Sequence, residues 1–343
     1  MFTSIALSTL LSLAHTLSAP AQSLDYSKMT AVGSPLTGST KAINSIAFSL
    51  KGKLIASGGD EKFIRLWSVE TRTEVGFAAQ KPAPSKPNKN LLDTKINFLS
   101  FMPRSRSVVS FNRDKSSSYW YATDPDSGNP GDQNGELVKK SVEVFDSEPT
   151  AVLFSENYFL IGFDNGLIQQ TDSSRSRQLT EFGRCFSKVM SLAISPDQRY
   201  FAAGCEKGTA FLWQPNTSKA VELKGHTGSV NTVAFCNQGL VLATGGADST
   251  IRLWDPKTGK QIGSALTGHT GAIVAMASIP DSYILATAGA DNTIRIWDVK
   301  SGKALGTPLT GHTDAITSLA FSPDGKLLAS GSKDKTIRLW KPS

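Results

Sequence analysis

Short runs of apolar residues recur along the chain, and within each run Val, Ile, Leu or Phe alternates with a small or polar residue. Alternation with a period of two is the pattern of β-strands with one buried face. Turn-forming residues separate the runs: Ser-Pro-Asp-Gly at 322–325 fits a type I turn, and Gly-Ala-Asp and Ser-Lys-Asp segments fit tight hairpins. No convincing helical pattern occurs within residues 29–343, so the chain is predicted to be all-β.

The last third of the chain repeats every 43 residues. Trp254, Trp297 and Trp340 are evenly spaced, and the His of a Gly-His pair lies 28 residues before each of them (His226, His269 and His312). A period of about 40–45 residues with Gly-His early and Trp late is typical of a β-propeller blade. These blocks resemble the repeats of the WD40 family, and the resemblance implies a ring of blades, because one blade cannot bury its faces alone.

Weaker copies of the same unit precede these three blocks. Four earlier units end near Trp67, Trp120, Gln170 and Trp213, with Gln170 standing where the Trp is expected. The total predicts a seven-bladed β-propeller over residues 29–343, preceded by a leader of residues 1–28. The segment 29–38 matches 302–311, so residues 29–36 are expected to supply the fourth strand of the last blade and close the ring.

The family resemblance also implies a hydrogen-bonded set of His, Ser or Thr, Asp and Trp inside a blade. Such polar groups have to be paired when a sheet edge buries them, and these four side chains have complementary donors and acceptors. The other four units depart from the pattern: the first has Ser39 and Glu61 in place of His and Asp, the second has Leu92 in place of His, the third retains almost none of the set, and the fourth has Ala203 and Lys207. The three complete sets are His226, Thr244, Asp248, Trp254; His269, Thr287, Asp291, Trp297; and His312, Ser330, Asp334, Trp340.

His, Ser or Thr, and Asp also occur in hydrolase active sites and zinc sites, but their arrangement here argues against both. A hydrolase triad needs one convergent set, whereas here a set recurs in every intact repeat with its hydroxyl in mid-strand. The three His residues belong to successive blades and are expected to lie too far apart to share a zinc ion. No GxSxG, HExxH, GxGxxG or Walker motif occurs. We therefore expect no enzymatic activity, no cofactor and no metal.

Charge, cysteine content and the leader bear on partners and compartment. The net charge of +7 is dispersed, which favours a solvated surface over a nucleic-acid-binding face. Cys185, Cys205 and Cys236 are odd in number and show no CxxC spacing, so we expect small buried side chains without a disulfide framework, and a cytoplasmic location. Residues 1–22 are too polar to span a membrane but resemble a signal peptide, a blade remnant or a disordered leader; a signal peptide would place the protein outside the cytoplasm.

The resemblance implies a monomeric, non-catalytic scaffold for protein–protein interaction. A sensor module of a larger signalling protein and a nucleic-acid-binding propeller are the alternatives. Long insertions at 78–90 and 122–136 are expected to be solvated loops. The predicted binding positions lie in the turns before each Asp and the loops after each Gly-His: Asp60, Arg113, Thr227, Ala247, Thr270, Ala290, Asp314 and Lys333.

Overall fold

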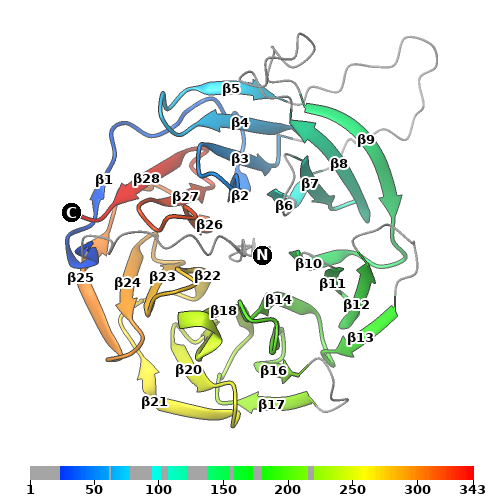
Figure 1. The fold of residues 1–343 in the computed structure, drawn as a ribbon, viewed down its shortest axis with the longest axis vertical. Coiled ribbons are helices and arrows are strands. Elements are labelled where there is room, and N and C mark those ends of the chain that lie inside the picture. Colours follow the sequence, from blue (N-terminus) through cyan, green and yellow to red (C-terminus); the bar gives the residue numbers. More distant parts are fainter. Residues whose placement is uncertain are drawn as a thin grey trace.

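Seven four-stranded antiparallel sheets are arranged as the blades of a closed ring (Figure 1). The computed structural model describes residues 24–61, 63–77, 95–101, 107–122, 137–154, 158–172, 180–214 and 220–343. The first strand of each blade faces the centre of the ring and the fourth lies at its outer edge. The all-β, seven-bladed propeller predicted from the repeat is therefore confirmed.

Blades one to four follow one another along the chain. Blade one contains β2 (Ile43–Phe48), β3 (Leu54–Gly59), β4 (Ile64–Ser68) and β5 (Glu74–Phe77). Blade two contains β6 (Ile96–Phe101), β7 (Ser107–Asn112), β8 (Ser116–Ala122) and β9 (Leu137–Val144). Blade three contains β10 (Pro149–Phe154), β11 (Tyr158–Phe163), β12 (Leu167–Asp172) and β13 (Thr180–Arg184). Blade four contains β14 (Val189–Ile194), β15 (Phe201–Cys205), β16 (Thr209–Trp213) and β17 (Ala220–Lys224).

Blades five to seven correspond to the regular repeats. Blade five contains β18 (Val230–Cys236), β19 (Val241–Gly246), β20 (Ile251–Asp255) and β21 (Lys260–Leu266). Blade six contains β22 (Ile273–Ser278), β23 (Ile284–Gly289), β24 (Ile294–Asp298) and β25 (Lys303–Leu309). Blade seven contains β26 (Ile316–Phe321), β27 (Leu328–Ser332), β28 (Ile337–Lys341) and β1 (Thr30–Ala31).

Helical structure is confined to two short 3₁₀ turns in the described residues, η1 (Tyr26–Lys28) and η2 (Asn237–Gly239). Neither turn has the length and apolar character that a helix needs to cross a membrane, so the described part of the chain contains no such helix.

The ring closes between distant parts of the sequence. In blade seven Thr30 lies opposite Lys341 and Ala31 opposite Trp340. The pairing continues past β1, where the Leu36 N–H donates to the Ile337 carbonyl at 2.8 Å. Before β1, the Tyr26 hydroxyl donates to the Gly325 carbonyl at 3.1 Å. The N-terminal strand thus completes blade seven, as the match between 29–38 and 302–311 predicted.

Burial follows the position of a strand in its blade. All residues of β10, β14 and β18 are buried, whereas most residues of the outer strand β21 are exposed or half-buried. Each blade packs its inner strands against the next blade, and a glycine is needed where the two approach closely. A Cβ on Gly245 of blade five would lie 2.6 Å from Ile273 Cγ2 of blade six. The apolar core is therefore a series of interfaces between blades.

Two connections of every blade lie at the same end of its sheet, because adjacent strands are antiparallel. We call the residues that lead into the first strand the entry loop, and those between the second and third strands the inner turn. The entry loops and inner turns of all blades together form one side of the ring, which we call the entry face. Every binding position predicted from the sequence belongs to this face.

Removal of residues 1–36 is expected to expose the edge of β28 and to cause aggregation, because an unpaired strand edge offers free N–H and C=O groups to other chains. Light scattering and thermal unfolding of the purified variant measure this. A deletion of residues 1–23, which keeps β1, is the control and should remain monomeric. A monomeric 1–36 deletion with unchanged thermal unfolding would contradict the closure.

Candidate functional site

The entry loop and the inner turn of blade five are joined by a chain of side-chain hydrogen bonds. His226 in the entry loop contacts Asp248 in the inner turn, with both carboxylate oxygens 3.0 Å from Nδ1. His226 Nε2 lies 2.8 Å from Thr244 Oγ1 on β19, and Trp254 Nε1 on β20 donates to that same oxygen at 2.9 Å. Because the indole can only donate and the carboxylate can only accept, the hydroxyl donates to Nε2 and Nδ1–H donates to Asp248.

Blades six and seven repeat this geometry. The imidazole–carboxylate distance is 2.9 Å in blade six and 2.7 Å in blade seven. The imidazole–hydroxyl distance is 2.8 Å in both, and the indole–hydroxyl distances are 2.8 and 2.9 Å. The structure therefore brings together all four members of both sets: His269, Thr287, Asp291, Trp297; and His312, Ser330, Asp334, Trp340.

These sets hold a neutral imidazole against an ionised carboxylate. Burial lowers the pKa of His226, His269 and His312, and the facing carboxylate only partly offsets that effect. Burial alone would raise the pKa of each partner Asp, but hydrogen bonds from the His, from a Thr side chain and from a backbone N–H hold it below its ordinary value. The hydroxyl is buried and already hydrogen-bonded, so the set is built to fasten the blade.

Blade one makes the same connection with different residues. The Glu61 carboxylate accepts from the backbone N–H of Thr40 in the entry loop and, at 2.8 Å, from Arg65 Nε on β4. Glu has one more methylene than Asp, and its carboxylate reaches the entry loop directly, without a His. The Trp67 indole still donates to Ser57 at 2.8 Å.

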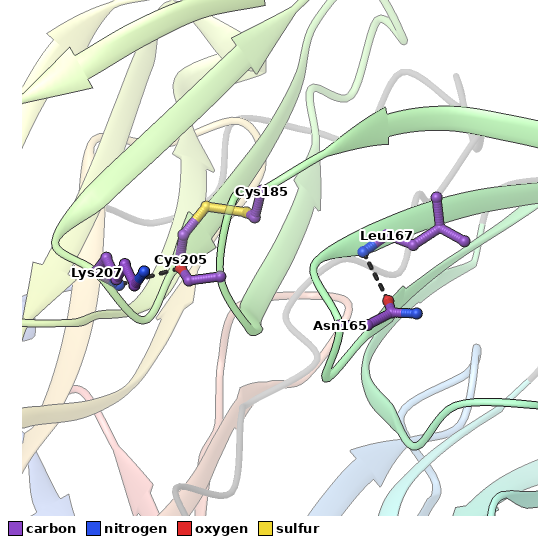
Figure 2. Close-up of a disulfide and its surroundings, with 6 residues drawn as sticks. Asn165, Leu167, Cys185, Cys205 and Lys207 are labelled. Atoms are coloured by element: carbon purple, nitrogen blue, oxygen red, sulfur yellow. Dashed lines mark hydrogen bonds between the residues drawn. A yellow bond between two sulfur atoms is a disulfide. The ribbon is translucent and has the colours of Figure 1, made fainter.

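Blade four makes this connection through a disulfide, which corrects the expectation of cysteines that are buried but not disulfide-bonded. Cys185 in the entry loop is bonded to Cys205, the last residue of β15, with the Cα atoms 5.9 Å apart (Figure 2). Cys236 alone remains a free, buried thiol, and burial raises its pKa to about 12. The two cysteines are 20 residues apart and show no local spacing motif, because they meet only through the pairing of strands.

Strand register shows what the disulfide replaces. Val189 pairs with Cys205 in blade four as Val230 pairs with Gly246 in blade five. By the same register Cys185 occupies the position of His226, four residues before the first strand. A Cβ on Gly246 would lie 2.4 Å from His226 Nδ1, so blade five leaves no room there for a side chain beside the His, whereas blade seven accommodates the small Ser332 next to His312. Comparing these two positions across the repeats would have revealed the pair.

Blade three has two aromatic residues at the same two positions. Phe145 lies four residues before the first strand, and Phe163 pairs with Pro149. Their ring centroids are 5.8 Å apart in an edge-to-face arrangement. Beside the rings the surface is hollowed by a cavity of about 240 Å³, whose lining comprises Phe145, Asp146, Ser147, Phe163, Asn165, Leu167 and Gln169.

Blade two retains only part of the polar set. Asn112 Nδ2 donates to Ser116 Oγ at 2.9 Å, and the Ser116 hydroxyl donates to Asp114 at 2.5 Å. Leu92 and the insertion 78–90 lie outside the described residues, as do residues 123–136 of the second insertion.

The predicted binding positions are spread around the entry face and do not form one cluster. Asp60 is half-buried and its carboxylate pairs with Lys95 Nζ at 2.8 Å, so it links blades one and two. The other seven are exposed: Arg113, Thr227, Ala247, Thr270, Ala290, Asp314 and Lys333. Their role in binding remains a prediction.

The most exposed large apolar side chain in the described part of this face was not among the predicted binding positions. Phe186 follows Cys185 in the entry loop of blade four and is 79% exposed. Its position corresponds to the polar Thr227 and Thr270 of blades five and six. An apolar residue next to a strand pattern is ordinarily assigned to the core, and only the repeat alignment places Phe186 at a loop position.

Asp334→Ala is expected to lower the free energy of unfolding by about 1–3 kcal/mol, because it leaves the buried His312 without its acceptor. Asp164→Ala is the matched control: Asp164 is exposed, and its carboxylate has no hydrogen bond within the described residues. It should change stability by less than about 0.5 kcal/mol. Urea unfolding measures both, and equal shifts in the midpoint would contradict a structural role for the set.

Comparison with known proteins agrees with the repeat geometry. The family model "WD domain, G-beta repeat" matches residues 30–68, 176–214, 217–255, 259–298 and 302–341, and each segment spans the outer strand of one blade and the first three strands of the next. Mouse transducin-like enhancer protein 2 is 33% identical over 73 residues, a stretch that covers 21% of this chain and 10% of that protein. This chain therefore belongs to the WD40 repeat family.

Proposed function

We propose that this propeller is a non-catalytic scaffold that binds a protein partner through its entry face. The observation that carries the proposal is Phe186, a large apolar side chain that is 79% exposed on this face. Exposed aromatic residues on a rigid support are frequent energetic centres of protein interfaces. WD40 propellers are generally non-catalytic and mediate protein–protein interaction, which supports the same conclusion.

The structure around Phe186 supports the role of an anchor. The preceding residue, Cys185, is fixed to β15 by the disulfide, and its N–H donates to the Gly166 carbonyl of blade three at 2.8 Å. The Phe186 ring makes an edge-to-face contact with Phe211 at a centroid distance of 6.1 Å. A side chain held in this way loses little conformational freedom when a partner covers it.

A structural use of the polar residues supports a non-enzymatic role. In blades five to seven, each His, hydroxyl and Asp is hydrogen-bonded within its own blade. Among the residues that the structure describes, no three His, Cys, Asp or Glu side chains are grouped so that they could hold a metal ion. The His, hydroxyl and Asp groups that could have suggested catalysis are thus used in hydrogen bonds that stabilise the blades.

Phe186→Asp should abolish or strongly reduce capture of the partner from an extract of the source cells, because it removes the apolar contact and adds a charge. Leu240→Asp is the matched control, since Leu240 is 59% exposed but lies between the first and second strands of blade five, on the opposite face. Quantitative mass spectrometry of the captured proteins compares the variants. If both variants retain the same partners as the original protein, the entry face around Phe186 is not the binding site.

We further propose that the protein folds in an oxidising compartment. The disulfide supports this proposal, because structural disulfides form and persist chiefly outside the reducing cytoplasm. It favours the alternative in which residues 1–22 act as a signal peptide over the cytoplasmic location expected from the cysteine count. Mass spectrometry of protein isolated with its free thiols blocked should find Cys185 linked to Cys205 and Cys236 alkylated. Alkylation of all three cysteines would exclude the proposal.

A further inference from the structure

The cavity of blade three opens on the entry face next to the loop that carries Phe186. Its lining comes from both connections of the blade: Phe145, Asp146 and Ser147 from the entry loop, and Asn165 from the inner turn. The inner turn touches the loop of blade four, since the Gly166 carbonyl accepts the Cys185 N–H. The cavity and Phe186 therefore belong to one continuous part of the surface.

The size of the cavity suits a single side chain. Pockets for small-molecule ligands usually measure about 300–1,000 Å³, whereas this one measures about 240 Å³. Its apolar wall consists of the Phe145 and Phe163 rings with Leu167 beside them. Ser147, Asn165 and Gln169 add polar groups to the lining, and Asn165 Nδ2 donates to Ser147 Oγ at 2.9 Å.

The loops around the cavity are acidic. The entry loop of blade three reads Phe-Asp-Ser-Glu and its inner turn Asp-Asn-Gly, so they carry Asp146, Glu148 and Asp164 and no basic residue. Asp146 and Asp164 are exposed, and neither carboxylate has an ion pair within the described residues. The neighbouring Lys115 ammonium donates to the backbone carbonyl of Asp146 at 2.7 Å. A ligand cation in the cavity would thus meet the Asp146 carboxylate, which has no ion pair within the described residues.

An apolar lining with the Asp146 carboxylate beside it, and with Asp164 in the adjoining turn, is complementary to a long cationic side chain. The methylene stem of an Arg or Lys packs on apolar surface while its charged head stays near water. The head is attracted by a carboxylate such as that of Asp146, which lines the cavity. An acidic side chain would be repelled, and a neutral aliphatic one would leave the carboxylates unused.

We propose that the cavity of blade three binds an Arg or Lys side chain of the protein partner, beside the apolar contact at Phe186. The proposal rests on the proposed function and specifies the partner: a basic residue adjacent to an apolar patch. The cavity gives charge selectivity, and Phe186 gives apolar contact area.

The test uses three N-acetylated, C-amidated pentapeptides that differ only at the central residue, which is Arg, norleucine or Glu between glycines. Amide NMR spectra of the full protein are recorded during titration. The Arg peptide should shift the signals of residues 145–148 and 164–169, and the norleucine and Glu peptides should bind at least about fivefold more weakly. Equal shifts from the Arg and norleucine peptides would overturn the proposal, as would no shift with any peptide.

Two charge-reversal variants test whether the Arg peptide binds at the cavity or is attracted by charge elsewhere on the protein. Asp146→Lys should weaken binding of the Arg peptide by at least about fivefold. Asp281→Lys, which makes the same change at an exposed position between the first and second strands of blade six, should not. Equal effects of the two variants would show general electrostatic attraction and contradict the proposal. Asp146→Asn removes only the charge and replaces Asp146→Lys if that variant does not fold.

Capture of the partner by these variants distinguishes a failure of the cavity proposal from a failure of the proposed function. If Phe186→Asp prevents capture while Asp146→Lys does not, and the Arg peptide fails to bind, the cavity proposal is wrong and the entry-face function stands. If the Arg peptide binds as described but neither variant affects capture, the cation-selective cavity stands and the proposed function of this face is wrong.

Discussion

The connection between the entry loop and the inner turn inside each blade is the constraint on which this propeller depends. The first strand is buried between neighbouring blades, so it must be fastened at the point where it enters the ring. Blades five to seven fasten it with a neutral His hydrogen-bonded to Asp and supported by a hydroxyl and a Trp. Blade one uses a Glu with an Arg, blade three an aromatic pair, and blade four a disulfide. Four chemistries thus meet one geometric requirement.

This constraint couples two positions that lie far apart in sequence. The partner of the first residue of each first strand is Gly in blades five and six, where the His ring occupies the space a Cβ would need. Where the His is missing, that partner position carries Phe163 in blade three, Cys205 in blade four, Asn112 in blade two and Gly59 in blade one. The entry face consequently has two sides of different character. Blades five to seven present compact polar turns, and blades three and four present a cavity and an exposed Phe, which is where we place the partner.

Much of the fold could be predicted from the sequence, because a 43-residue period and evenly spaced Trp residues permit few architectures. The closing strand was also predictable, since residues 29–38 match the outer strand of blade six. The disulfide, the Phe145–Phe163 pair and the exposed Phe186 were missed for one shared reason. Each lies in a blade without the His–Asp pair, where only the strand register identifies equivalent positions. Apolar residues and cysteines at unaligned positions are read as core; Phe145, Phe163, Cys185 and Cys205 are indeed buried, but their pairing was not foreseen, and Phe186 is exposed.

The most direct test of the shared constraint transplants the polar set into blade four. The variant Ala203→Thr, Cys185→His, Cys205→Gly, Lys207→Asp places the residues of blade five around the existing Trp213. Urea unfolding with and without reductant is compared with that of the original protein and of Cys185→Ser, Cys205→Ser. The account predicts that reductant lowers the unfolding midpoint of the original protein but not of the transplant, whose midpoint exceeds that of the double Ser variant. A transplant no more stable than the double Ser variant would contradict the equivalence of disulfide and His–Asp set.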